Sequence, residues 1–348
     1  MTKVLIVEDS QVIQEFLRLI FASDPEIRVV GVVQNGEEAL EQVSRLKPDV
    51  ITMDFNMPRM NGVEATRRIM ETHPTPIVIV TGSSSALEVA ITFRALEAGA
   101  LTVVTRPAGF GDPGHQAAAR DLIQTVKLMS EVKVVRRWPR RTSTPPRPSA
   151  RPIEGLRRPA EVQIVAIGSS TGGPVACQKI LAALPKSFPA PVLLVQHITA
   201  GFINGFAEWL SQSTGFPVHV AGHGEPTLPG QVYVAPDGFH LLVDQDRSLA
   251  LSAEPPENGL RPSVSALFRS VVRVYGRHAV GILLSGMGKD GAVELRSMKD
   301  MGGITVVQNQ ESSVVYGMAA EAVRLEAATY VMAPDAIAGV LHRLTGQM

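Results

Sequence analysis

The chain has 348 residues, and its 33 basic and 33 acidic side chains give a formal net charge of zero. That length accommodates two domains of ordinary size, and the neutral balance excludes a protein that attracts nucleic acid through a global positive field. Because no apolar stretch approaches a membrane span and the first apolar run is too short for a signal peptide, we expect a cytoplasmic protein that is not membrane-inserted.

Short apolar runs alternate with helix-like segments over residues 1–128, which we interpret as the first domain. Apolar side chains recur at helical spacing between the runs, for example from Val12 to Phe21. Five such alternations predict a five-stranded, doubly wound parallel sheet, in which ligands bind at the carboxyl ends of the strands. The predicted strands are residues 4–7, 29–33, 50–53, 77–80 and 101–104.

Side chains suited to phosphoryl transfer follow four of these strands. Glu8 and Asp9 follow the first, Asp54 the third, Thr81 the fourth and Arg106 the fifth. Three carboxylates at one sheet edge repel one another, and oxygen ligands of this number suit Mg²⁺. The set predicts phosphoryl capture by one carboxylate, with the metal and Arg106 neutralising charge and Thr81 binding a phosphoryl oxygen.

Residues 7–10, 53–62, 80–82 and 106–107 make this domain resemble the receiver domain of response regulators. The resemblance implies a flavodoxin-like fold, phosphorylation of Asp54 by a histidine kinase, and Mg²⁺ held by Glu8, Asp9 and Asp54. Two positions depart from the family pattern. Arg106 replaces a lysine, and Val103 stands where an aromatic residue is common, so the link between phosphorylation and a ring-rotation switch stays open.

Residues 129–160 are expected to form a linker, because the sequence becomes basic and proline-rich beyond about residue 135. Proline removes helical donors and like charges repel, which predicts an extended connector. A contact with an acidic partner or an anionic surface is the alternative. No zinc-finger, helix-turn-helix or aromatic-interleaved motif accompanies the tract, so we do not expect it to bind nucleic acid.

Residues 161–348 alternate again and predict a second α/β domain with a mostly parallel sheet. Two short runs on either side of Asp237 and Gly238 suggest that the sheet carries a hairpin. The single cysteine, Cys177, lies in a helix-like stretch and is interpreted as a packed thiol rather than a reactive one. The predicted strands are residues 162–167, 192–196, 232–234, 239–243, 280–284 and 304–307.

The glycine-rich stretch 168–173 separates the first of these runs from a helix-like segment. Ser170 lies between Gly168 and Gly172 in the pattern G-x-S-x-G, which is typical of a nucleophile elbow. A phosphate cradle at a helix N-terminus needs the same glycines, although the Gly-Lys-Ser/Thr ending of a nucleotide P-loop is missing. A structural turn is the third interpretation.

A nucleophilic serine needs a histidine to accept its proton. His197 follows the second predicted strand of this domain, and it shares an edge with Ser170 if the strands are parallel. His240 lies within a predicted strand and is interpreted as a packed or surface residue. His219 and His223 could form a metal pair, but they lack nearby carboxylate or thiol support in the sequence.

Asp290 lies in the glycine-rich loop 285–291, just before a predicted helix. It is either a helix N-cap or the acid that orients His197, and the same loop could supply an oxyanion hole. The order Ser170, His197, Asp290 along the chain differs from the orders of the catalytic residues in α/β-hydrolases, chymotrypsin and subtilisin, which disfavours a conventional α/β-hydrolase.

Residues 167–174, 196–202, 234–237, 284–292, 308–309 and 316–318 resemble the catalytic domain of bacterial chemotaxis protein-glutamate methylesterases. The resemblance implies that Ser170 is the nucleophile, His197 the base and Asp290 its partner. It also places Thr171 and the Met287 loop in the site, with the Met287 backbone N–H as oxyanion donor. Ala319 departs from the family, which usually has proline after Gly-Met.

The resemblance further implies a phosphorylation-regulated serine esterase in chemotaxis adaptation, without a cofactor in the esterase site. Its substrates would be γ-methyl-glutamyl side chains of methylated chemoreceptors, with deamidation of glutamine as a second activity. A histidine kinase of a chemosensory array would be the phosphodonor, and the unphosphorylated receiver would occlude the site. Two alternatives stay open: the same esterase with a client outside chemotaxis, and a phosphorylation-controlled binding module without turnover.

Overall fold

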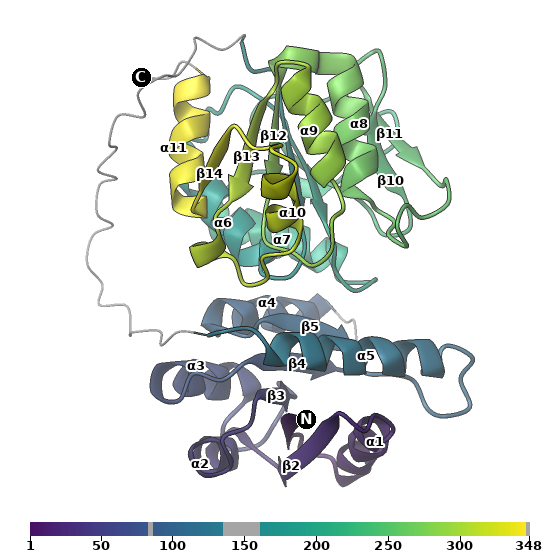
Figure 1. Cartoon of the computed structure of the whole chain (residues 1–348), viewed down its shortest axis with the longest axis vertical. Helices are drawn as coiled ribbons and strands as arrows, with labels where there is room; N and C mark the ends of the chain where they lie inside the picture. Colours follow the sequence, from purple (N-terminus) through teal and green to yellow (C-terminus); the bar gives the residue numbers. More distant parts are fainter. Residues whose placement is uncertain (83–85, 135–160, 346–348) are drawn as a thin grey trace. The chain divides into compact units, whose positions relative to one another are not determined.

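The structure is a computed structural model that describes residues 1–82, 86–134 and 161–345. The chain divides into two compact units, residues 1–145 and 146–348, and each is described by itself (Figure 1). The predicted end of the first domain at residue 128 falls inside a helix that continues to Ser130. Most of the predicted linker, residues 135–160, lies outside the described residues.

The first unit is a five-stranded sheet in the order β2-β1-β3-β4-β5 with every neighbouring pair parallel, as predicted. Because the chain order reverses between β1 and β3, the carboxyl ends of these two strands flank the point where such sheets bind ligands. The elements are β1 (Thr2–Val7), α1 (Gln11–Ala22), β2 (Ile27–Val33), α2 (Gly36–Leu46), β3 (Val50–Met53), α3 (Gly62–Thr72), β4 (Ile77–Thr81), α4 (Ala86–Ala98), β5 (Thr102–Thr105) and α5 (His115–Ser130).

The sheet of the first unit is buried between helices. Helix α1 packs against α5, while α2, α3 and α4 pack in succession, which gives each face of the sheet a helical layer. The central strands β1 and β3 are near-continuous runs of buried Val, Ile, Leu and Met, as expected of strands covered on both faces.

The second unit is a seven-stranded sheet in the order β14-β13-β12-β6-β7-β9-β8, with all pairs parallel. Its elements are β6 (Ile164–Ser169), α6 (Gly173–Ala183), β7 (Val192–Gln196), α7 (Ile203–Thr214), β8 (Val218–Val220), β9 (Val232–Val234), β10 (His240–Val243), β11 (Leu249–Ser252), α8 (Val264–Tyr275), β12 (Ala279–Leu283), α9 (Ala292–Asp300), β13 (Ile304–Gln308), α10 (Met318–Arg324), β14 (Tyr330–Met332) and α11 (Pro334–Leu344).

The hairpin predicted around Asp237 and Gly238 is wrong. Strand β9 belongs to the main sheet and pairs in parallel with β7 and β8. Strand β10 instead pairs antiparallel with β11 in a separate two-stranded sheet. The turn of that hairpin is formed after Val243, where Arg247 adopts a left-handed conformation (φ 71°) and the Asp246 carboxylate accepts the Ser248 N–H.

Strand β6 is the topological centre of the second unit. After β6 the chain adds β7, β8 and β9 on one side of it, then crosses over to add β12, β13 and β14 on the other. The loops after β12, β6 and β7 therefore meet at one edge of the sheet, at the point where the strand order reverses. Helices cover both faces of this sheet as well, with α6, α7 and α11 in one group and α8, α9 and α10 in the other (Figure 1).

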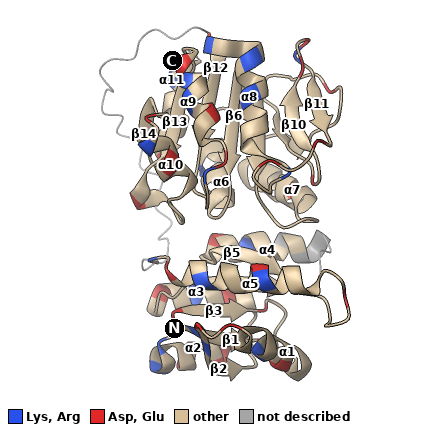
Figure 2. Ribbon diagram, turned by 45° about the vertical axis from the view of Figure 1, so that its right-hand side comes forward, with Lys and Arg blue, Asp and Glu red and all other residues tan. Residues whose placement is uncertain are grey.

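Charged residues of both signs are interspersed along the helices of the two units (Figure 2). This distribution agrees with the zero net charge of the chain. None of the described helices is both long enough and apolar enough to span a membrane.

Candidate active site

The first unit gathers three carboxylates at the reversal of its strand order. Glu8 and Asp9 follow β1, Asp54 follows β3, and one ligand atom from each lies within 4.8 Å of the others. Burial, followed by the nearby Asp54, raises the pKa of Glu8 to about 7. Burial also raises the pKa of Asp54. Acids held in this way need positive charge to stay ionised, and three oxygen donors fit Mg²⁺.

Thr81 and Arg106 border this carboxylate cluster. Thr81 is the buried last residue of β4, and its carbonyl accepts the Arg106 N–H at 2.7 Å. A Cβ atom on Gly82 would lie 2.4 Å from Nη2 of Arg106, so glycine makes room for the guanidinium. Arg106 lowers the pKa of both Glu8 and Asp54, although burial outweighs it. A cation thus lies near the acids, and the neighbouring strand ends in a hydroxyl-bearing residue, a combination that suits an anionic phosphoryl group.

The second unit places Ser170, His197 and Asp290 on three neighbouring loops. Ser170 directly follows β6, His197 directly follows β7, and Asp290 lies between β12 and α9. Because β12, β6 and β7 are adjacent and parallel, the three residues share the carboxyl edge of the sheet. This topology brings together residues that lie up to 120 positions apart in the sequence.

The backbone of Ser170 is fixed from both sides. Its N–H donates to the Ser285 carbonyl at 3.0 Å, and its carbonyl accepts from Nε2 of Gln196 at 2.9 Å. The same Nε2 donates to the His197 carbonyl at 2.9 Å, so one amide ties nucleophile and base together. A Cβ atom on Gly286 would lie 2.7 Å from Cβ of Ser170, which requires glycine there.

His197 faces Asp290 through Nε2, which lies 3.1 Å from Oδ2 of the carboxylate. The N–H direction is not aligned with this oxygen, and no other described residue accepts a hydrogen bond from Nε2. With Nε2 on the side of Asp290, Nδ1 is the ring nitrogen that remains for a second partner. An imidazole with its proton on Nε2 would have Nδ1 free to accept a proton from serine.

Asp290 is only 2% exposed, and burial by itself raises its pKa. The neighbouring His197 and the Val264 N–H, at 2.7 Å from Oδ2, outweigh burial and lower the pKa to about 2. Oδ1 accepts from the Ser263 hydroxyl at 2.8 Å and the Ser265 N–H at 3.0 Å. Asp290 is therefore ionised at neutral pH and can stabilise an imidazolium.

Backbone donors for an oxyanion come from two loops. Neither the Thr171 N–H nor the Met287 N–H donates to another described residue. Thr171 precedes α6, and Met287, which is exposed, follows Gly286 in the loop after β12. Two free N–H groups beside a serine could receive the negative charge of a tetrahedral intermediate.

The structure also tests the predictions made for three other histidines of the second unit. His240 is packed, with 2% exposure. The expectation that His219 lacks a carboxylate is wrong, because its Nε2 lies 2.6 Å from Oε1 of Glu225. His223, however, accepts the Leu251 N–H through Nδ1. Within the described part of the chain, only the carboxylate cluster of the first unit meets the geometry of a three-ligand metal site.

Sequence reasoning missed the roles of Ser263 and Ser285. Ser263 precedes an apolar helix and has the signature of an N-cap, which could have been read locally. Its hydrogen bond to Asp290 spans 27 residues and has no local signal. Ser285 accepts the Val315 N–H at 3.0 Å and donates to the Thr171 carbonyl at 2.7 Å, which joins three loops.

Comparison with known proteins identifies both units. The CheB methylesterase family matches residues 165–341, and the response regulator receiver domain family matches residues 4–112. A protein-glutamate methylesterase/protein-glutamine glutaminase of Geobacter metallireducens is 55% identical over 345 residues, covering 99% of each chain. One of Nitrosospira multiformis is 54% identical, covering 100% of this chain and 98% of its own.

The second unit also has a solved relative. The crystal structure of the CheB methylesterase catalytic domain of Thermotoga maritima matches with a TM-score of 0.51 and 35% identity, covering 53% of this chain and all of that one. Family matches to both units, together with relatives aligned over their whole length, leave one assignment. The chain belongs to the protein-glutamate methylesterase/protein-glutamine glutaminase family, in which a response regulator receiver domain precedes a CheB methylesterase domain.

Proposed function

We propose that the chain is a phosphorylation-regulated serine esterase that acts in the cytoplasm on chemoreceptors. It hydrolyses γ-methyl esters of receptor glutamates, releasing methanol, and deamidates receptor glutamines. The observation that carries the proposal is the meeting of Ser170, His197 and an ionised Asp290 on three adjacent loops. Relatives named for both activities, at 54–55% identity over the full chain, support the substrate class.

In the acylation step, the Ser170 hydroxyl attacks the ester carbonyl while Nδ1 of His197 accepts its proton. The Thr171 and Met287 N–H groups bind the oxyanion that forms. As the tetrahedral intermediate collapses, the C–O bond to the methoxy group breaks. His197 then returns its proton to that oxygen, and methanol leaves with an acyl-enzyme behind it.

Deacylation repeats the sequence with water in place of serine. His197 takes a proton from water, the hydroxide adds to the acyl carbonyl, and Ser170 leaves with the proton that His197 gives back. A glutamate carboxyl group is the product. With glutamine the same steps apply, and the leaving group is ammonia instead of methanol.

The receiver unit supplies the regulation. The Asp54 carboxylate accepts a phosphoryl group from a histidine kinase, and Thr81 and Arg106 bind the phosphoryl oxygens. Glu8, Asp9 and Asp54 would hold Mg²⁺, which neutralises phosphoryl charge. We further propose that the unphosphorylated receiver limits access to Ser170, and that phosphorylation shifts the population towards an open form.

The test is methanol release from methylated receptor membranes by the full chain, with and without acetyl phosphate and Mg²⁺. Ser170→Ala should abolish release and should leave labelling of Asp54 by acetyl phosphate intact. Asp54→Asn should show the reverse pattern, with basal release retained and stimulation by acetyl phosphate lost. Undiminished release by Ser170→Ala would overturn the assignment of the nucleophile.

A serine-directed fluorophosphonate separates the esterase from a binding module without turnover. The esterase is labelled at Ser170, and labelling is lost in Ser170→Ala. Absence of labelling in the unsubstituted chain, combined with absence of methanol release, would favour the binding module.

A further inference from the structure

We propose that His240 and Ser263 are positioning residues that hold the Asp290 carboxylate in place for His197. The inference rests on the proposed roles of Ser170, His197 and Asp290. The chain of contacts runs from strand β10, through the first turn of α8, to the catalytic loop after β12.

The first link is the N-terminus of α8, which supplies the hydrogen bonds of Asp290. The Val264 N–H donates to Oδ2, and the Ser265 N–H and the Ser263 hydroxyl donate to Oδ1, at 2.7–3.0 Å. Ser263 is the N-cap of this helix, and its Oγ also accepts the Ser265 N–H at 3.1 Å. Asp290 therefore behaves as an anion bound at a helix N-terminus, where free N–H groups favour negative charge.

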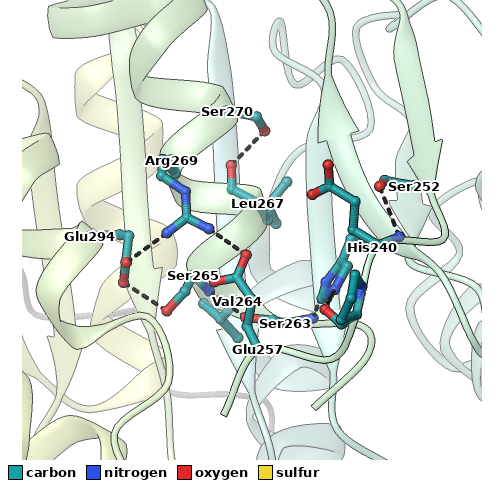
Figure 3. Close-up of polar contacts among 12 residues, drawn as sticks. His240, Ser252, Glu257, Ser263, Val264, Ser265, Leu267, Arg269, Ser270 and Glu294 are labelled. Atoms are coloured by element: carbon teal, nitrogen blue, oxygen red, sulfur yellow. Dashed lines mark hydrogen bonds and ion pairs between the residues drawn. The ribbon is translucent and has the colours of Figure 1, made fainter. Parts of the chain in front are cut away.

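The second link is His240, which holds the N-cap itself (Figure 3). Its Nδ1 accepts the Ser263 N–H, and its Nε2 donates to the Pro255 carbonyl, both at 3.2 Å. Accepting at Nδ1 and donating at Nε2 fixes one neutral tautomer. The backbone N–H of Ser263 is therefore held by His240, while the Ser263 hydroxyl donates to Asp290. Both side chains are at most 2% exposed, so water does not replace these bonds.

A second connection between β10 and α8 provides an internal comparison. Ser270 lies about two turns beyond Ser263 in α8. It accepts the Val243 N–H at 3.1 Å and donates to the Leu267 carbonyl at 2.8 Å. It joins the same two elements as His240, and it is also buried. Its hydrogen bonds do not reach Asp290. Loss of Ser270 should therefore loosen β10 against α8 without moving the carboxylate.

The consequence for catalysis concerns the charge on His197. Oδ2 of Asp290 faces Nε2 of His197 at 3.1 Å. A carboxylate that rotates away stabilises the imidazolium less, which slows the steps in which His197 carries the proton. Substrate contacts are not involved, so KM should stay nearly constant while kcat falls.

The experiment compares His240→Leu, His240→Asn and Ser270→Ala in the full chain. His240→Leu should lower kcat by about 10-fold, and it should move the acidic limb of the kcat/KM profile to lower pH. His240→Asn keeps an acceptor for the Ser263 N–H and should restore most of kcat. Ser270→Ala should leave the pH profile unchanged, even where urea unfolding shows a similar loss of stability.

A pH profile that moves equally, or not at all, in His240→Leu and Ser270→Ala would overturn the proposal. If His240→Leu does not fold, Ser263→Ala and Ser263→Thr decide the question. Threonine keeps the hydroxyl and should keep the profile, whereas alanine should shift it; no shift with alanine refutes the role.

Nitrogen-15 NMR of the histidine rings gives a readout that does not depend on turnover. We expect His197 protonated on Nε2 in the unsubstituted chain and an altered Nε2 signal in His240→Leu. An unaltered signal counts against the proposal. Retained methanol release by Ser170→Ala would instead refute the proposed function, so the two failures are distinguishable.

Discussion

Replacing Asp290 by asparagine tests the electrostatics of the site with almost no change in shape. Oδ1 accepts from Ser263 and Ser265, while Oδ2 accepts from Val264 and faces His197. An amide can keep an oxygen on only one of these sides. With the amide NH₂ group at the Oδ1 position, the Ser265 N–H faces a donor, and the negative charge opposite His197 is gone.

The expected loss of stability follows from the pKa of Asp290. Folding lowers this pKa from 3.8 to about 2, so the folded state favours the ionised form and binds fewer protons than the unfolded state. The stabilisation is fully present above the unfolded pKa, at about 2 kcal/mol. It is lost as pH falls through the folded pKa, and about 1 kcal/mol remains near pH 3. Asparagine removes this pH-dependent contribution.

The assay is urea unfolding of the full chain and of Asp290→Asn, followed through Trp209 of the second unit. The difference between the two free energies of unfolding cancels the titration of all other acids. It should be about 2 kcal/mol at pH 7 and roughly half of that at pH 3. At neutral pH, kcat for methanol release should fall by about 100-fold or more. A stability difference that is constant between pH 7 and pH 3 would refute the reasoning.

Three further predictions concern other parts of the molecule. Gly82→Ala places a Cβ atom 2.4 Å from the Arg106 guanidinium, so it should slow labelling of the chain by acetyl phosphate. Adding Arg106→Lys to this variant should restore the labelling rate. Independent effects of the two substitutions on the rate would contradict the contact. Gly286→Ala forces a Cβ atom to 2.7 Å from that of Ser170 and should lower kcat by about 10-fold or more, measured as methanol release; unchanged kcat would exclude the contact. Cys177 is buried, and burial raises its pKa to about 12, so iodoacetamide should label it only after the chain unfolds. Mass spectrometry measures the labelling, and rapid labelling of the folded chain would refute the interpretation of Cys177 as a packed thiol.

The strand-end residues could be predicted from the sequence because one geometric rule covers them. Parallel strands present their carboxyl ends at one edge, so an apolar run followed by Asp54, Ser170 or His197 already places each side chain at an edge. The rule needs only local information about where a buried strand ends. The structure brings the corresponding residues onto shared edges in both units.

Pairing between distant strands could not be predicted in the same way. Asp237 and Gly238 correctly mark a turn, but a turn signal does not say which strand the chain pairs with next. Strand β9 pairs with β7 and with the three-residue strand β8, which is only half buried and has no clear apolar run. The hydrogen bond between Ser263 and Asp290 could not be predicted for the same reason, since it depends on where α8 begins in space.

The order of the catalytic residues along the chain follows from the order in which this sheet is built. Ser170 follows the central strand β6, and His197 follows β7, which pairs with β6 on one side. The other neighbour of β6 is β12, which follows β7, β8 and β9 in the sequence. An acid on that side must therefore come last, as Asp290 does.

The same topology explains how that acid stays ionised. A helix that connects to a parallel strand runs back along the sheet, so it begins at the carboxyl edge. Helix α8 leads into β12 in this way, and its first N–H groups point at the edge where Asp290 lies. The crossover that delivers the acid thus also delivers the positive end of a helix to it. Ser263 and His240 need only hold the start of α8 in place against Asp290, and through Asp290 they act on His197.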